Sequence, residues 1–172
     1  MTSAVPSESA RTARNGLSIA AIAVFYGLLA YASIAVTFSN GRLAAFWIGN
    51  ALVVGYLVGR SLGRQVTTIA LCICAGVTAN FAVGDEPLLA LGLGSANLLE
   101  LVAMLAVIER VILRSQPFST VEQFFRLCLA GVLVPIVSGS LASAVFTSVR
   151  DASFLTTFGL FPVSTNGTDL RL

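Results

Sequence analysis

The sequence predicts an all-α protein, a polytopic bundle of transmembrane helices. Of its 172 residues, 56% are apolar and only 10% are charged, whereas a soluble domain carries about 25% charged residues. The mean hydropathy is +0.91. So few charges cannot cover the surface of a water-soluble globule of this size, which excludes a soluble cytoplasmic enzyme. The charge-free intervals are as long as membrane helices and do not alternate polar with apolar residues, as spanning strands would.

Five apolar segments are expected to cross the bilayer. A hydrocarbon core about 30 Å thick needs roughly 20 helical residues, with about 17 to 25 tolerated. The charged residues divide the chain into expected spans near residues 17–38, 43–59, 65–83, 88–113 and 127–149. The second of these is marginal in length. Together the five spans make up one expected membrane domain, residues 15–150.

The two ends of the chain differ from this domain in composition. Residues 1–14 are rich in Ser, Thr, Ala and Arg, and we expect them to be a flexible cytoplasmic tail. Residues 151–172 mix a short apolar run with a polar finish. They are therefore expected to be either a tail or a truncated sixth helix.

The first segment has a second interpretation, as a signal peptide. Arg11 and Arg14 precede an apolar stretch, and residues 30–32 (Ala-Tyr-Ala) resemble a cleavage site. Apolar character nevertheless continues beyond that tripeptide to Phe38, and four more apolar segments follow. An uncleaved first span is therefore the favoured interpretation.

The arginines predict the orientation, because loops on the cytoplasmic side carry an excess of basic residues. If the N-terminus is cytoplasmic and the five spans alternate, seven arginines lie inside and three outside. The seven are Arg11, Arg14, Arg60, Arg64, Arg110, Arg114 and Arg126, and the three are Arg42, Arg150 and Arg171. All basic residues are arginine, which hints at a bacterial genome rich in G and C. We therefore expect a bacterial inner-membrane protein with a cytoplasmic N-terminus.

The residue types that are missing exclude several kinds of chemistry. The sequence contains no histidine, so a His-ligated zinc or haem site and a Ser-His-Asp triad are excluded within it. The net charge of +2 is too small and too dispersed for nucleic-acid binding. Cys72, Cys74 and Cys128 lie in apolar stretches and are interpreted as packing residues. With no nucleophile–base pair and no phosphate-binding loop, we expect a non-enzyme without cofactor or metal.

Four polar residues inside the apolar segments require an explanation: Asn50, Asn80, Asn97 and Glu100. A charge at the centre of a membrane helix costs roughly 2.5–3.5 kcal/mol, so Glu100 is either protonated or faces a polar cavity with a partner. Asn97 lies on the same helical face, and the expected partners of Glu100 are Asn50, Asn80 or backbone carbonyl groups. Two interpretations stay open. One is a ligand- or signal-sensing pocket, and the other is an interhelical hydrogen-bond clamp.

Small residues at four-residue spacing predict close packing of helices. The glycines that belong to such series are Gly55 and Gly59 in the second segment, Gly76 in the third and Gly139 in the fifth. Pro135 removes a backbone hydrogen bond from the fifth segment and is expected to kink it. Trp47 is expected to anchor its segment at the membrane interface.

Four motifs follow one another along the chain at regular intervals. They are Trp47-Ile48-Gly49-Asn50-Ala51, Gly76-Val77-Thr78-Ala79-Asn80, Ser95-Ala96-Asn97-Leu98-Leu99-Glu100, and Pro135 with the small-residue run Ser138–Ala144. In their order and spacing they resemble the membrane-associated sensor domain of the first MASE class. The resemblance covers about residues 17–149, most of the chain.

The resemblance implies a signal-input function. In that family the membrane domain precedes a cytoplasmic output module, such as the histidine kinase of a two-component system or a diguanylate cyclase or phosphodiesterase that acts on cyclic-di-GMP. The family domain has more than five helices, so this sequence resembles either a truncated sensor or one that acts in trans. The expected partners are the lipid bilayer, a small-molecule or membrane signal, a second copy of the chain and an output domain.

Transport is the alternative function, as a small transporter component or a substrate-binding membrane subunit. The same midplane polar residues would bind the substrate, and Pro135 and the glycines would serve broken helices. Two features count against this function. No inverted repeat relates the two halves of the chain, and Glu100 is a single buried carboxyl group, which is little to couple substrate transport to the movement of an ion. A purely structural subunit is a third interpretation.

Overall fold

A computed structural model of the chain describes residues 8–37, 47–110 and 121–150, and this part is entirely helical apart from two turns. Its helices are α1 (Glu8–Thr37), α2 (Trp47–Leu57), α3 (Leu62–Ala82), α4 (Pro87–Ile108) and α5 (Val121–Arg150). The expected tail or sixth helix at 151–172 lies outside the described residues. So do residue 38 and residues 43–46 and 111–113 of the expected spans.

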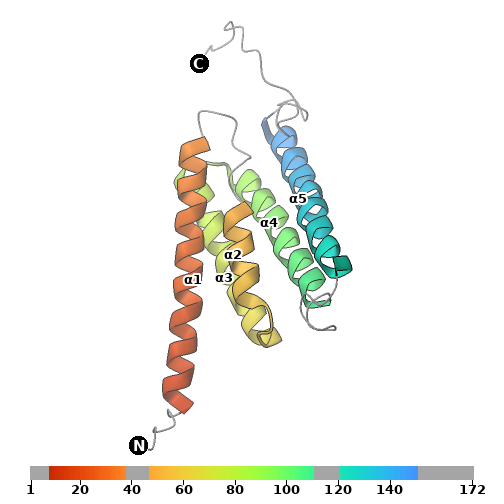
Figure 1. The fold of residues 1–172 in the computed structure, drawn as a ribbon. Helices are drawn as coiled ribbons and strands as arrows, with labels where there is room; N and C mark the ends of the chain where they lie inside the picture. The colour runs from red at the N-terminus through yellow and green to blue at the C-terminus, as the bar shows by residue number, and fades with distance from the viewer. Residues whose placement is uncertain (1–7, 38–46, 111–120, 151–172) are drawn as a thin grey trace, which may run out of the picture.

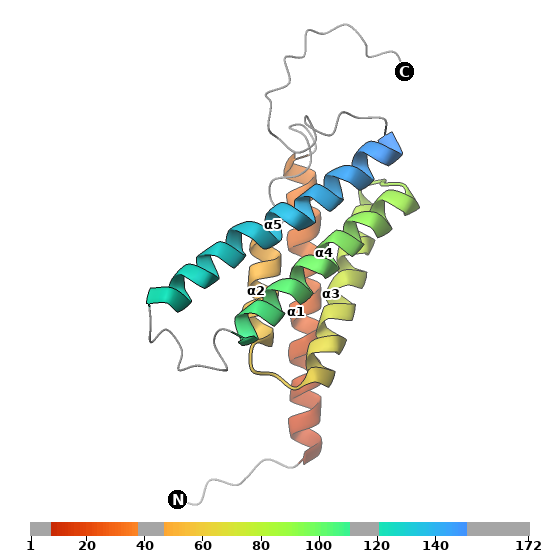
Figure 2. The same cartoon turned by 90° about the vertical axis from the view of Figure 1, so that its right-hand side faces the viewer.

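Successive helices of the bundle run in opposite directions (Figure 1). Helices α1, α3 and α5 point one way, and α2 and α4 point the other. Helix α1 packs mainly on α3, α4 packs on both α3 and α5, and α2 contacts α4, α1 and α3. Figure 2 shows α5 on the outer side of α4, away from α1. Helix α4 is therefore the element that connects the outer helix to the rest of the bundle.

The two described turns depend on glycines in the left-handed region of backbone conformation. Gly59 ends α2 with a φ of 73°, and Gly84 follows α3 with a φ of 86°. Other residues adopt such angles only with strain, whereas glycine has no Cβ to clash. After Gly84, the Asp85 backbone N–H donates to the Asn80 carbonyl oxygen over 3.1 Å. Pro87, whose fixed φ suits the first turn of a helix, then begins α4.

Four of the helices, α1, α3, α4 and α5, are long and apolar enough to cross a membrane. The expectation of five spans is thus only partly met. Helix α2 has 11 residues and is about 16 Å long at 1.5 Å per residue, roughly half of a hydrocarbon core. It ends at Leu57 because Gly59 turns the chain toward α3, two residues before the expected boundary.

The N-terminal segment differs from the expected flexible tail. Helix α1 begins at Glu8, so the second half of residues 1–14 is helical. Alanine and arginine both favour helices. The membrane-length apolar part of α1 begins at Thr12, and the residues from Glu8 onward extend the same helix on its N-terminal side. Helix α1 then runs without a break through residues 30–32 and places Tyr26 and Ala30 in the core.

The described part of the chain has a small core and a largely apolar exterior. Tyr26, Val53, Leu57, Cys72 and Leu101 are almost completely buried at the centre. Large apolar side chains are exposed on every helix, and those of α5 include Phe124, Phe125, Leu129, Val132 and Val137. Such a surface would be unfavourable in water but is well solvated by lipid. Cys72 packs in the core as expected, whereas Cys74 and Cys128 are exposed.

Glycines allow close helix contacts, but not at all the positions that their spacing predicts. A Cβ at Gly94 of α4 would lie 2.6 Å from Val77 Cγ2 of α3, and Gly92 of α4 meets Val145 of α5 closely. Gly55, in contrast, is exposed with open space around it, and Gly59 serves the turn. Within the described residues, no neighbouring helix packs closely on Gly55 or Gly59, so their predicted packing role stays a prediction.

The remaining residues singled out for packing or anchoring belong to α2, α3 and α5. Gly76 is buried in α3, and Gly139 is half-buried in α5. Pro135 lies inside α5, and the helix continues on both sides of it. Trp47 is the first residue of α2, but its side chain lies outside the described part, so its role as an interfacial anchor stays a prediction.

Candidate functional site

The polar centre of the bundle begins at Tyr26 of α1. Its ring lies between two glycines: a Cβ at Gly49 of α2 would approach the ring to 3.3 Å, and one at Gly76 of α3 to 3.2 Å. The buried Tyr26 hydroxyl donates a hydrogen bond of 2.9 Å to Asn50 Oδ1 on α2. Gly49 and Gly76 thus leave room for the aromatic ring whose hydroxyl reaches Asn50.

Asn50 continues this set of contacts toward α4. Its Nδ2 group donates to Asn97 Oδ1 over 3.5 Å, which is at the upper limit for a hydrogen bond. Asn50 is almost fully buried, and Asn97 is half-buried. The three residues Tyr26, Asn50 and Asn97 form a network across α1, α2 and α4, and its longest contact is the one between the two asparagines.

Glu100 connects the same face of α4 to α5. Its Oε2 atom accepts a hydrogen bond of 2.9 Å from the hydroxyl of Ser138, and both residues are buried. Ser138 Oγ also lies 3.2 Å from the carbonyl oxygen of Pro135. Asn97 and Glu100 lie three residues apart, on one face of α4. We call the five residues Tyr26, Asn50, Asn97, Glu100 and Ser138 the central polar network.

Asn80 is buried, but its contact is of another kind. Its Nδ2 group donates to the carbonyl oxygen of Gly76, one turn earlier on the same helix, over 2.9 Å. This hydrogen bond satisfies a polar side chain locally and does not join two helices. Of the four polar residues singled out in the sequence, the structure therefore brings Asn50, Asn97 and Glu100 into the central polar network, and Asn80 bonds to its own helix.

The sequence interpretation missed two members of the network, Tyr26 and Ser138. Tyr26 interrupts a long run of apolar residues, and Ser138 follows Pro135 by three residues, one turn later on the same helix. Both are weak signals, because tyrosine and serine are common in membrane helices. Only the packing of α1 on α2 and of α4 on α5 shows their partners.

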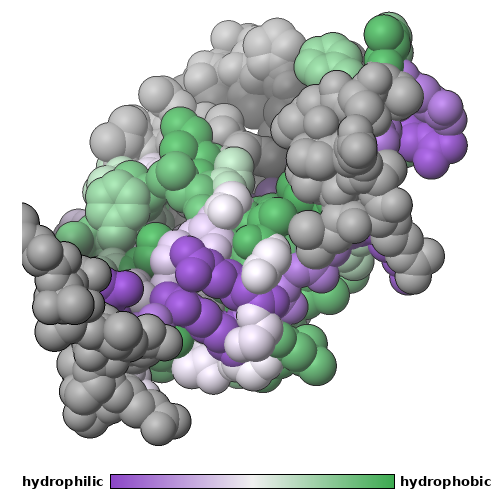
Figure 3. Space-filling model, turned by 60° about the horizontal axis from the view of Figure 1, so that its bottom comes forward, coloured by the Kyte–Doolittle hydropathy of each residue, from purple (hydrophilic) through white to green (hydrophobic). Residues whose placement is uncertain are grey.

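A second polar cluster lies at the end of the bundle where α1, α3 and α5 begin. Arg11, Arg14, Arg60, Arg64, Arg110 and Arg126 all belong to helix ends or turns on this side, whereas Arg150 ends α5 on the opposite side. Figure 3 shows hydrophilic side chains gathered on this face, between apolar surfaces. The gathering of these arginines at one end agrees with the expected division of charge, although it does not identify the side of the membrane.

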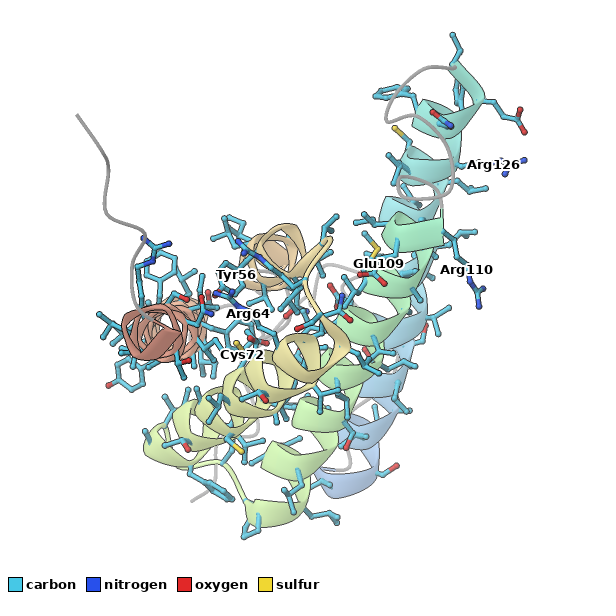
Figure 4. The ribbon with its side chains drawn as sticks, turned by 90° about the horizontal axis from the view of Figure 1, so that it is seen from below. Tyr56, Arg64, Cys72, Glu109, Arg110 and Arg126 are labelled. Atoms are coloured by element: carbon cyan, nitrogen blue, oxygen red, sulfur yellow. The ribbon has the colours of Figure 1, made fainter. Side chains whose placement is uncertain are left out.

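Arg64 is the centre of this cluster. Its guanidinium donates to Asn15 Oδ1 over 3.1 Å, to the Ser18 hydroxyl over 2.8 Å and to the Tyr56 hydroxyl over 2.7 Å. Figure 4 shows Tyr56 and Arg64 next to one another, with Arg110 and Arg126 pointing away on the far side of the bundle. Arg60 stacks on the same tyrosine, its guanidinium carbon 5.3 Å from the ring centroid.

The electrostatic surroundings of Tyr56 follow from these contacts. Burial acts to raise the pKa of the Tyr56 hydroxyl, but its hydrogen bonds with Ser18 and Arg64, and the charges of Arg64 and Arg60, together lower the pKa below its ordinary value of 10.0. Beside this cluster, the Gln65 amide of α3 donates to the carboxyl group of Glu109, the residue that follows α4. The polar end therefore ties α1, α2, α3 and the end of α4 together.

Neither cluster offers an evident centre for metal binding. Among residues 8–37, 47–110 and 121–150, no group of three His, Cys, Asp or Glu side chains is placed to hold a metal ion. The central polar network contains one carboxyl group, and its other members are neutral hydroxyl and amide groups. Such groups bind by hydrogen bonding, and they suit recognition of a small polar molecule or a change in helix packing.

The comparisons with known proteins identify no relative: the chain matches no family model, no curated protein and no solved structure. The resemblance to the MASE sensor domain therefore depends on its sequence motifs alone and stays a prediction. Two of those motifs supply Asn50, Asn97 and Glu100, which lie in the central polar network.

Proposed function

We propose that this chain is a membrane-embedded signal-input domain, which senses a small polar ligand or a state of the membrane at the central polar network. One observation carries the proposal: hydrogen bonds cross the bundle from α1 through α2 to α4, and again from α4 to α5. A network that joins four helices makes their packing depend on its own hydrogen bonds. The motifs that resemble the MASE domain support the same function.

The contact between Asn50 and Asn97 is the proposed point of ligand entry into the network. At 3.5 Å it is the longest of the three interhelical hydrogen bonds in the central polar network, so a ligand that donates to one amide and accepts from the other would replace it at little cost. Asparagine both donates and accepts, which favours a ligand with hydroxyl, amide or carboxyl groups. The bound ligand would separate α2 from α4 and thereby alter the environment of Glu100, one turn further along α4.

Helix α5 is the proposed responding element. It packs mainly on α4 and is attached there by the hydrogen bond from Ser138 to Glu100. A ligand shifts such an equilibrium only by its difference in affinity for the two arrangements. In the proposed mechanism the liganded network weakens the Ser138–Glu100 bond, and α5 moves relative to α4.

In this proposal a partner protein responds to the movement of α5. We propose that the domain acts in a bacterial inner membrane with its N-terminus in the cytoplasm, that two copies associate, and that a cytoplasmic histidine kinase or a cyclic-di-GMP enzyme reads the position of the helices. The domain itself would bind and transmit rather than catalyse. The arginine-rich end, where α1 begins, is the end expected to face that output module.

The test is a binding screen on the full chain in lipid nanodiscs. Its thermal unfolding is followed against a panel of amino acids, sugars, nucleosides and organic acids, because a ligand that binds the folded state raises the unfolding temperature. We expect a stabilising compound whose effect is lost in Asn97→Leu and weakened in Glu100→Gln. Ser140→Ala is the matched control, because the Ser140 hydroxyl bonds to the Ile136 carbonyl oxygen of its own helix.

The same compound then separates sensing from transport. Spin labels on α4 and α5 are expected to change their separation when it binds, and proteoliposomes are expected not to accumulate it. Accumulation of the compound in proteoliposomes would establish the transport function instead. A compound that stabilises wild type and Asn97→Leu equally would place its binding outside the central polar network.

A further inference from the structure

The arginine cluster at the end of the bundle has an unusual charge arrangement that the proposed sensing function does not use. Arg60 and Arg64 place their guanidinium carbons 5.3 Å and 5.5 Å from the centroid of the same ring, that of Tyr56. Two like charges on one small ring repel each other, and attraction to the ring offsets only part of that cost.

Among the described residues, the contacts of the two guanidinium groups leave both charges without a counter-ion. Arg64 donates to the amide oxygen of Asn15 and to the hydroxyls of Ser18 and Tyr56, and Arg60 donates from Nε to the Tyr56 carbonyl oxygen over 3.4 Å. All of these acceptors are neutral. Within the described part of the chain neither arginine forms a salt bridge, and Arg64 Nε is buried without an acceptor.

Exposed apolar side chains lie beside the cluster, where the acyl chains of a bound lipid would cover them. Leu17 precedes Ser18 on α1 and is 73% exposed, and Leu62, between the two arginines in sequence, is 75% exposed. Val66, one turn further along α3, is also exposed. A free phosphate ion would gain nothing from these side chains, whereas the acyl chains of a lipid would cover them.

We propose that Arg60, Arg64 and Tyr56 form a binding site for the headgroup phosphate of an anionic phospholipid. Guanidinium groups bind phosphate oxygens with paired, charge-assisted hydrogen bonds. The hydrogen bonds from Arg64 to α1 and α2 hold one guanidinium in place, and the exposed Arg60 closes on the phosphate from the turn. Arg14, one turn before Ser18 on α1, is a further exposed arginine at this end of the bundle.

The location of the site explains why the ligand is a lipid of the surrounding leaflet. The cluster lies where α3 begins its membrane-length apolar window at Leu62, which is the level of the headgroups. A lipid seated there contacts α1, α2 and α3 at once, so it stabilises the packing of α1 on the bundle. This inference concerns a different site from the central polar network and holds whether or not that network senses a ligand.

The experiment measures lipid selectivity by electron spin resonance on the full chain in phosphatidylcholine vesicles. Spin-labelled phosphatidylglycerol and spin-labelled phosphatidylcholine are added in turn, and the association of each with the protein is measured. We expect a preference for phosphatidylglycerol that falls about fivefold in Arg60→Gln, the factor that corresponds to the loss of one arginine near an anionic surface. Arg60→Gln is chosen because Arg60 is exposed and its loss leaves the Arg64 contacts in place.

Arg110→Gln is the matched control, because Arg110 is exposed at the same end of the bundle but points away from the cluster. Its preference for phosphatidylglycerol is expected to change less than twofold. Equal losses in the two variants would show a diffuse surface charge and overturn the site. Displacement of the labelled lipid by inorganic phosphate at constant ionic strength, or no preference over phosphatidylcholine, would also overturn it.

Discussion

The hydroxyl of Ser138 on α5 donates a 2.9 Å hydrogen bond to the carboxyl group of Glu100 on α4, and both side chains are buried. Ser138 lies one turn after Pro135, whose carbonyl oxygen is 3.2 Å from the same hydroxyl. The polar group that is most costly to bury in the bundle is thus satisfied by a small side chain of the outermost helix. Because α5 packs mainly on α4, the hydrogen bond between Ser138 and Glu100 contributes directly to the attachment of α5 to the bundle.

Replacement of Ser138 by alanine is expected to destabilise the bundle by about 1–2 kcal/mol, since the buried carboxyl group loses a hydrogen-bond donor. Unfolding of the protein in mixed detergent micelles measures the effect. Ser140→Ala, two residues away on the same helix, removes a hydroxyl that bonds within α5 and is expected to change stability by less than about 0.5 kcal/mol. Similar losses in both variants would argue against the interhelical bond.

Replacement of Gly94 by alanine is expected to destabilise the bundle by about 1–3 kcal/mol, because the new methyl group would lie 2.6 Å from Val77 Cγ2 and force α3 and α4 apart. Gly55→Ala is the matched control. Open space surrounds Gly55 within α2, so alanine there is expected to be neutral or stabilising by about 0.5–1 kcal/mol. Thermal unfolding of both variants in the same detergent tests the contrast, and a loss at Gly55 as large as that at Gly94 would contradict it.

Replacement of Tyr26 by phenylalanine is expected to cost about 1 kcal/mol, because Asn50 loses the hydroxyl that donates to it while the ring still fills the space between Gly49 and Gly76. Tyr31→Phe, on the exposed face of the same helix, is expected to have no measurable effect. Chemical unfolding of the two variants gives the comparison. An unchanged stability in Tyr26→Phe would mean that the hydroxyl contributes nothing to the network.

The orientation is testable by cysteine labelling in intact bacterial cells, in a background where the three native cysteines are replaced by alanine. Ser61 lies in the turn at the arginine-rich end, and Glu86 lies in the turn at the opposite end. With a cytoplasmic N-terminus, Glu86→Cys is expected to react with a membrane-impermeant maleimide in spheroplasts, and Ser61→Cys only after the membrane is permeabilised. The reverse pattern would place the arginine-rich end outside.

The candidate site was predictable in part. The spacing of Asn97 and Glu100 placed both side chains on one face of a helix, and the structure puts both in the central polar network. The partner of Glu100 was not predictable: Asn50, Asn80 and backbone carbonyls were expected, whereas Ser138 supplies the bond. Asn80 illustrates the reason. An asparagine in a helix can donate either to the carbonyl oxygen one turn earlier on its own helix, as Asn80 does, or to a neighbouring helix, and the packing of the helices decides between these two partners.

The sequence by itself determined the class of structure: its apolar, helix-length segments gave an all-helical fold with membrane-length helices, because backbone polar groups in lipid must be satisfied within the segment. It also placed all of the described arginines except Arg150 at one end, since alternating helices return them there. The tertiary structure alone decided the shortness of α2, the exposed position of Gly55 and the partners of Tyr26, Glu100 and Arg64. These features depend on contacts between helices, which a pattern along one helix does not specify.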